Sequence, residues 1–119
     1  MTPQRLVIVD NDQAVLDLLL LDLRLEGHDI LATAMDGESA IRVCEEQQPA
    51  VLVVDLRLGP GPNGLDVAEH VRREGLRIVL HTNYVNPDVV SRAKRLGVTV
   101  VEKGSLHALR RAIEAEPGV

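Results

Sequence analysis

Residues 51–58 read VLVVDLRL, in which the uninterrupted apolar run VLVV is followed by an aspartate, Asp55. The run lacks the polar alternation of a half-exposed strand, so it predicts a strand buried on both faces, over Val51–Asp55. Comparable runs, rich in β-branched residues, lie on either side of it in the chain. They are Leu6–Val9, Ile30–Ala34, Ile78–Thr82 and Val98–Glu102.

Longer amphipathic segments separate and follow these strands, and most carry helix start or stop signals. We expect helices from the cap Asp12 to about Glu26, over about 38–48 before Pro49, from Asn63-Gly64 to near Gly75, from the cap Asn86 to Gly97, and from Ser105 to about Ala115. Strict alternation of five strands and five helices predicts an α/β fold. Its sheet is parallel, with helices on both faces and right-handed crossovers.

Composition narrows the class of protein. The chain has 119 residues, 45% hydrophobic and 26% charged, which suits one globular domain. A net charge of −5 argues against direct nucleic-acid binding, and an aromatic content of 1% removes the usual stacking platforms for flavins or nucleobases. No apolar stretch has the length of a membrane span and no signal peptide is evident, so we expect a soluble, cytoplasmic protein with no membrane association.

Polar residues gather where the predicted strands end, and the carboxyl ends of parallel strands meet at one edge of a sheet. Clustered carboxylates repel each other and coexist best with a divalent or side-chain cation between them. Oxygen ligands without a His/Cys cluster favour magnesium, and such a site suits transfer of a phosphoryl group to a carboxylate. The strand-end residues are Asp10, Asn11, Asp12, Asp55, His81, Thr82, Glu102 and Lys103.

Several motifs together resemble one known family over essentially the whole chain. In order they are LVIVDND, VLVVDLRL with a Gly-Pro-rich loop leading to NGLDVAEHVR, IVLHT, and LGVTVVEK. They are similar to the receiver domain of bacterial response regulators, the phosphoacceptor half of two-component signalling. The resemblance implies a single flavodoxin-like (βα)5 domain over residues 1–119 with strand order 2-1-3-4-5.

The resemblance also implies residue roles. Asp55 is the expected phosphoacceptor, with Thr82 and Lys103 binding the phosphoryl group. The implied Mg²⁺ ligands are Asp10, Asn11, Asp55 and the backbone carbonyl of Arg57, and the candidate modulators are Asp12, His81 and Tyr84.

The expected partner is a histidine kinase or a phosphotransfer protein. Phosphorylation would switch partner or effector interactions. The domain is expected to be no enzyme beyond its own self-catalysed phosphorylation and dephosphorylation.

Two alternatives remain open. Asn11 stands where the family usually has a second acid, and Val100 where many members have a switching aromatic residue, which favours an unphosphorylated pseudo-receiver used only for protein interaction. Asp10 and Asp12 also resemble the DxD motif of haloacid dehalogenase-like phosphatases, which would make the protein an enzyme. That second alternative leaves Asp55 without a role.

The first helix contains more leucines than one buried face can use. By comparison with relatives, Leu16 and Leu20 are expected to point outward. We therefore expect this helix to dock a kinase, a phosphotransfer domain or a second copy of the chain.

Overall fold

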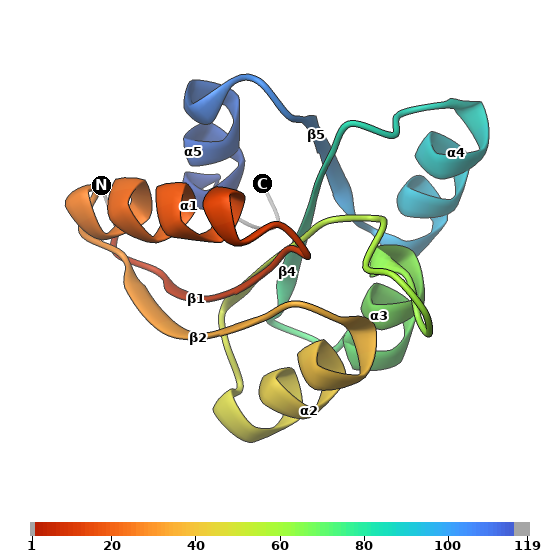
Figure 1. Cartoon of the computed structure of the whole chain (residues 1–119), viewed down its shortest axis with the longest axis horizontal. Coiled ribbons are helices and arrows are strands. Elements are labelled where there is room, and N and C mark those ends of the chain that lie inside the picture. Colours follow the sequence, from red (N-terminus) through yellow and green to blue (C-terminus); the bar gives the residue numbers. More distant parts are fainter. Residues whose placement is uncertain (1, 116–119) are drawn as a thin grey trace.

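The computed structural model describes residues 2–115. Five strands and five helices alternate along this part of the chain (Figure 1). Among the described residues no helix is long and apolar enough to cross a membrane. The elements are β1 (Arg5–Val9), α1 (Gln13–Leu25), β2 (Asp29–Ala34), α2 (Gly37–Gln47), β3 (Val51–Val54), α3 (Gly64–Val71), β4 (Arg77–Thr82), α4 (Pro87–Leu96), β5 (Thr99–Glu102) and α5 (Leu106–Glu114).

The strands form one parallel sheet in the order β2-β1-β3-β4-β5, which confirms the predicted architecture. The central strand β3 pairs Val54 with Val9 of β1 on one side and with Leu80 of β4 on the other. At the far edge Thr82 of β4 pairs with Glu102 of β5. This register brings the carboxyl ends of all five strands to one edge of the sheet.

Two hydrophobic layers enclose the sheet, because neighbouring residues of a strand point to opposite faces. Leu6 and Ile8 of β1 pack with the inward leucines of α1 and with α5, whereas Val7 and Val9 pack with α2, α3 and α4. Figure 1 shows α1 and α5 together on one side of the sheet. Every residue of β3 is buried, as its apolar sequence predicts.

The helix starts follow the predicted capping residues. Asp12, Asn63, Asn86 and Ser105 each accept a hydrogen bond from a backbone N–H of the first turn. The predicted end of α3 near Gly75 is wrong, because the helix stops at Val71. The chain leaves the helix there, and the Arg73 guanidinium then donates a hydrogen bond to the Pro49 carbonyl at 2.8 Å.

The orientation predicted for α1 is also wrong. Leu16 is only 2% exposed and packs in the core, and Leu20 is half-buried. The inward face includes Asp22, whose carboxylate is paired with the Arg110 guanidinium of α5 at 3.0 Å. Leu16, Leu19 and Leu23 form the buried stripe of the helix and pack in the core with Leu6 and Ile8 of β1, so a different set of leucines is exposed.

Candidate functional site

Asp10 and Asp55 follow β1 and β3 directly, on neighbouring strands. Their side chains are almost fully buried, with residue exposures of 1% and 4%. The Asp55 N–H donates to the Val9 carbonyl at 3.0 Å, and the Asp10 N–H donates to the Ala34 carbonyl at 3.1 Å. The sheet ladder thus continues one residue past each strand and fixes both aspartates at the same edge.

Lys103, which follows β5, bridges the two carboxylates. Its Nζ lies 2.8 Å from Asp10 Oδ2 and 2.9 Å from Asp55 Oδ2. The other oxygen of each carboxylate accepts a backbone hydrogen bond: Asp10 Oδ1 from the Asp12 N–H at 2.9 Å, and Asp55 Oδ1 from the Leu56 N–H at 2.7 Å. Every carboxylate oxygen is therefore oriented by a donor.

The electrostatics of this trio favour binding of a further cation. Burial alone would lower the pKa of Lys103, but hydrogen bonds to Asp10 and Asp55 outweigh it, and the pKa of Lys103 is raised above its ordinary value. A charged lysine between two ionised carboxylates leaves a net charge of about −1 at a nearly buried position.

Thr82 ends β4 beside this trio and is completely buried. Its Oγ1 accepts a hydrogen bond from the Tyr84 N–H at 3.1 Å, which leaves the hydroxyl proton available for another acceptor. The Thr82 carbonyl accepts a hydrogen bond from the Lys103 N–H at 3.0 Å, so the hydroxyl and the ammonium come from adjacent, hydrogen-bonded chain segments.

An open pocket of about 480 Å³ lies over the carboxyl edge. Its wall is largely polar and includes the carboxylate of Asp55, at the end of β3. The guanidinium of Arg57 lies over the Tyr84 ring in this wall, 3.7 Å from the ring centroid. The lining residues are Asn11, Asp12, Asp55, Arg57, Leu58, Gly59, Asn63, Asn83, Tyr84 and Lys103.

A close backbone approach shapes the loop after Asp55. A Cβ on Gly64 would lie 2.1 Å from the Asp55 carbonyl oxygen, so only glycine fits where α3 begins. The Gly64 N–H in turn donates to the Leu56 carbonyl at 2.8 Å. The Asn63-Gly64 pair predicted a helix start from the sequence. It did not indicate that Gly64 lies against the backbone of Asp55.

The candidate modulators occupy different surroundings. Asp12 caps α1 through a hydrogen bond from the Ala14 N–H at 2.9 Å, and it also lines the pocket. Tyr84 lies in the pocket wall with Arg57. His81 points away from that pocket, because its neighbour Thr82 occupies the opposite face of β4.

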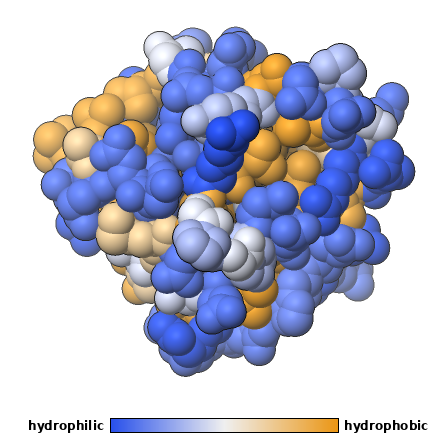
Figure 2. Space-filling view, turned by 45° about the vertical axis from the view of Figure 1, so that its right-hand side comes forward, coloured by the Kyte–Doolittle hydropathy of each residue, from blue (hydrophilic) through white to orange (hydrophobic). Residues whose placement is uncertain are grey.

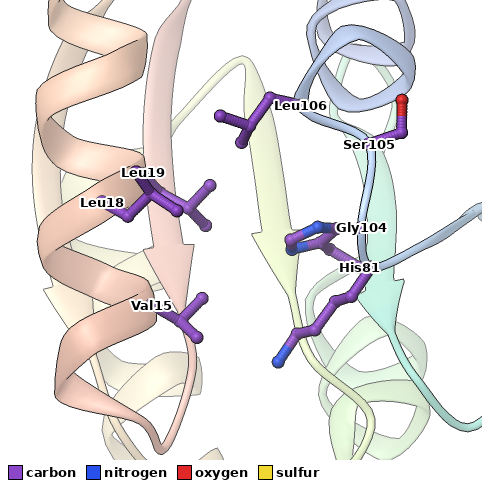
Figure 3. A pocket seen from close by; sticks show the side chains of 8 residues that line it. Val15, Leu18, Leu19, His81, Gly104, Ser105 and Leu106 are labelled. Atoms are coloured by element: carbon purple, nitrogen blue, oxygen red, sulfur yellow. The ribbon is translucent and has the colours of Figure 1, made fainter.

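His81 faces a second, mostly apolar groove between α1 and the β5–α5 connection (Figure 3). This groove measures about 240 Å³. The imidazole is buried, and its Nδ1 has no hydrogen-bond partner among residues 2–115. Burial lowers the pKa of His81, and the charge of Lys103 lowers it further. The groove is lined by Val15, Leu18, Leu19, His81, Lys103, Gly104, Ser105 and Leu106.

The donor chemistry at the carboxyl edge fits magnesium. Asp10 and Asp55 supply carboxylate oxygens, and Asn11 borders the same pocket with an amide oxygen. These are hard oxygen ligands of the kind that Mg²⁺ prefers, and each carboxylate oxygen keeps a second lone pair. Within the described residues no three His, Cys, Asp or Glu side chains form a metal-binding group, so an Mg²⁺ ion here would depend on amide, carbonyl or phosphoryl oxygens as well.

Comparisons with known proteins agree with this architecture. The family model described as "Response regulator receiver domain" matches residues 6–114. A LuxR-family two-component response regulator from Aurantimonas sp. SI85-9A1 is 31% identical, with a TM-score of 0.83 over 95% of this chain and 84% of the other.

Two further solved structures share the fold. A LuxR-family DNA-binding response regulator from Staphylococcus aureus is 25% identical, with a TM-score of 0.85 over 92% of this chain and 95% of the other. A chain of the CheX-CheY-BeF3-Mg complex from Borrelia burgdorferi is 22% identical, with a TM-score of 0.83 over 92% and 86% of the two chains. By the match of the family model over almost its whole length, this chain belongs to the receiver domains of response regulators.

Proposed function

We propose that Asp55 of this chain accepts a phosphoryl group from a histidine kinase or a phosphotransfer protein, with Mg²⁺ at the same site. The observation that carries the proposal is the Lys103 ammonium, which lies within 2.9 Å of a carboxylate oxygen of both Asp10 and Asp55. Two buried carboxylates share one lysine, so the site keeps a net negative charge that can bind a metal ion. The lysine itself is a cation already in position to bind the anionic phosphoryl group.

The transfer itself needs little covalent chemistry from the protein. An Asp55 carboxylate oxygen attacks the phosphorus of a phosphohistidine donor, the P–N bond breaks, and the donor imidazole takes up a proton. The product is an acyl phosphate on Asp55. Lys103 and the Thr82 hydroxyl bind its oxygens, where fixed donors stabilise the charge that develops during transfer.

The metal would be held by Asp10, Asp55, Asn11 and the backbone carbonyl of Arg57. When bound to these oxygens, Mg²⁺ would neutralise negative charge on the phosphoryl group. Asn11 replaces a charged ligand with a neutral amide, so the protein contributes less negative charge than an all-acid set would.

The phosphatase alternative receives less support from the local geometry. Asp12 would have to serve as the acid/base of a DxD motif, yet its carboxylate caps α1 by accepting the Ala14 N–H. Asp10 Oδ2 is also engaged by Lys103, together with Asp55. Asp55 but not Asp10 is among the residues that line the open pocket, which favours Asp55 as the acceptor and Asp10 as its supporting acid.

The test is phosphorylation by acetyl phosphate with Mg²⁺, followed by intact-mass measurement. We expect one phosphoryl adduct, lost in Asp55→Asn and lost in the wild type when EDTA removes the metal. Asp36→Asn, which changes an exposed capping acid outside the pocket, is the matched control and should keep the adduct. No adduct on the folded wild type at saturating Mg²⁺ would indicate a pseudo-receiver, and an adduct that survives Asp55→Asn but not Asp10→Asn would indicate the phosphatase-like chemistry.

A further inference from the structure

The outer face of α1 exposes a row of leucines. Leu18, Leu21 and Leu25 are 51%, 62% and 75% exposed, the three most exposed large hydrophobic residues among those described. In Figure 2 apolar surface lies at the left-hand edge, on the side where Figure 1 places α1. Three neighbouring exposed leucines on one helix are an unusual use of surface in a soluble domain.

The spacing of this row is that of a helix–helix seam. With Ala14, which is also exposed, the positions are 14, 18, 21 and 25, separated by four, three and four residues. Apolar residues repeated in this way form the contact stripe of packed helix pairs. The four positions define the α1 seam: Ala14, Leu18, Leu21 and Leu25.

Charged residues flank the α1 seam unequally on its two sides. One side carries Asp22, which is already paired with Arg110 of α5. The other side carries Asp17 and Arg24, seven residues apart and both exposed. Asp17 accepts only a hydrogen bond from the Gln13 amide at 2.9 Å, and the Arg24 side chain has no partner among residues 2–115. This open flank therefore holds one unpaired acid and one unpaired base.

An open flank with one acid and one base is complementary to itself when two copies meet in opposite directions. In an antiparallel helix pair the same flank of each helix faces the other, so Asp17 of one copy would lie beside Arg24 of the second, twice by symmetry. A parallel pair would instead set the open flank against the flank that α5 covers.

We propose that α1 is a self-association surface on which a second copy of this chain packs antiparallel. Leu18 of each copy contacts Leu21 of the other, and Ala14 gives room for Leu25. Two Asp17–Arg24 ion pairs set the direction. The seam spans one helix of 13 residues, about 20 Å long, so the buried area lies at the low end of stable interfaces and the dimer is reversible.

Sedimentation equilibrium from micromolar to millimolar concentration tests the surface. We expect the average mass of the wild type to rise from the monomer value of 13.0 kDa towards twice that value. Leu21→Lys should remain monomeric throughout. The matched control Val90→Lys changes an exposed apolar residue of α4 and should associate like the wild type. Circular dichroism of each variant confirms that it is folded.

A charge-reversal pair tests the direction and the partner. Arg24→Asp alone and Asp17→Arg alone each place like charges opposite one another, and each should weaken self-association about tenfold. An equimolar mixture of the two variants restores both ion pairs in a mixed dimer, so it should associate as tightly as the wild type. The mixed pair has this property only in the antiparallel arrangement.

Three results would overturn the proposal. One is a wild type that stays monomeric at every concentration. The second is a dimer that neither charge reversal nor Leu21→Lys weakens. The third is a result in which Leu21→Lys slows phosphoryl transfer from a phosphodonor protein, but not from acetyl phosphate, at concentrations where the wild type is monomeric. The surface would then bind the phosphodonor and not a second copy.

Discussion

The Arg57 guanidinium stacks on the Tyr84 ring at 3.7 Å from its centroid, joining two loops that the sequence separates by 27 residues. Arg57 lies two residues after Asp55, and Tyr84 lies two residues after Thr82. Both line the pocket over the carboxyl edge. The stack therefore lies in the wall of the pocket onto which Asp55 opens, and we predict that it restricts the access of water to a phosphoryl group on Asp55.

Removing the ring should shorten the lifetime of that phosphoryl group. Cation–π stacking at an exposed site contributes about 0.5–1 kcal/mol, so Tyr84→Ala should speed hydrolysis of the acyl phosphate about two- to fivefold by freeing both loops. Intact-mass spectra taken at intervals after removal of acetyl phosphate give the rate. Tyr84→Phe keeps the aromatic face and should behave like the wild type. Equal or slower hydrolysis in Tyr84→Ala would show that the stack does not restrict water.

Lys103 should be needed for stability as well as for phosphoryl binding. Lys103→Met leaves Asp10 and Asp55 buried without their cation, and breaking a buried pair by removing one partner costs about 3 kcal/mol. Urea unfolding in EDTA measures the loss. The only other lysine, Lys94, is exposed on α4, and Lys94→Met should change the free energy of unfolding by less than about 0.5 kcal/mol. Adding Asp10→Asn to Lys103→Met should recover part of the lost free energy of unfolding. Equal stability of Lys103→Met and Lys94→Met would contradict the prediction.

The stability that Lys103 provides has a defined pH window. Its pKa is raised in the folded protein, so its contribution is fully present below the ordinary value of 10.5 and is lost as pH rises through the higher folded pKa. The stability difference between wild type and Lys103→Met should therefore stay constant up to about pH 10 and narrow above it. Urea unfolding at a series of alkaline pH values checks this. A difference that stays constant or grows as the pH rises above 10.5 would show that the folded pKa of Lys103 is not raised.

The sheet and the central trio could be predicted from the sequence because their signals are local. An apolar run such as VLVV can be read without knowing its neighbours, and caps such as Asn63 and Asn86 act within one helical turn. Once strand order follows from the alternation and the family resemblance, strand-end residues such as Asp55 must share an edge. The structure places Asp10 and Lys103 against Asp55, where the sequence predicted them to lie together.

Features that depend on distant contacts could not be predicted. The first helix has leucines on several faces, so periodicity alone fits more than one orientation. The observed orientation packs Leu16, Leu19 and Leu23 against strand and α5 residues that are distant in the sequence, and the Asp22–Arg110 ion pair joins residues 88 positions apart. The Arg57–Tyr84 stack likewise joins two loops, and the early end of α3 accompanies a hydrogen bond from Arg73 to the Pro49 carbonyl. None of these pairings can be recognised from the residues adjacent to either partner in the sequence.

His81 should destabilise the fold at mildly acid pH. Burial lowers the folded pKa of His81 below its ordinary value of 6.5, so protonation favours the unfolded chain, and stability falls as pH drops below 6.5 towards the folded pKa. His81→Leu removes this dependence and the unpartnered Nδ1, and it should raise the free energy of unfolding by about 1 kcal/mol at pH 7 and by more at pH 5. Urea unfolding at both pH values measures the difference. His107→Gln, at an exposed position on α5, should show no such change. A pH-independent gain in His81→Leu would mean that the imidazole titrates normally in the folded protein.

Asn11→Asp should tighten magnesium binding, because it restores a negative charge at the position where the site has a neutral amide. One added charge near a bound Mg²⁺ ion should strengthen its binding about tenfold or more. Without metal the same charge repels the Asp10 and Asp55 carboxylates, which Lys103 alone must then balance, so the metal-free variant should unfold at a lower temperature than the wild type. Calorimetric titration with MgCl₂ measures the affinity, and thermal unfolding in EDTA measures the repulsion. Asn63→Asp adds the same charge elsewhere in the pocket and can keep the cap of α3, so it separates ligation from general attraction and should tighten binding much less. If Asn11→Asp and Asn63→Asp strengthen binding equally, or if neither does, residue 11 does not ligate the metal.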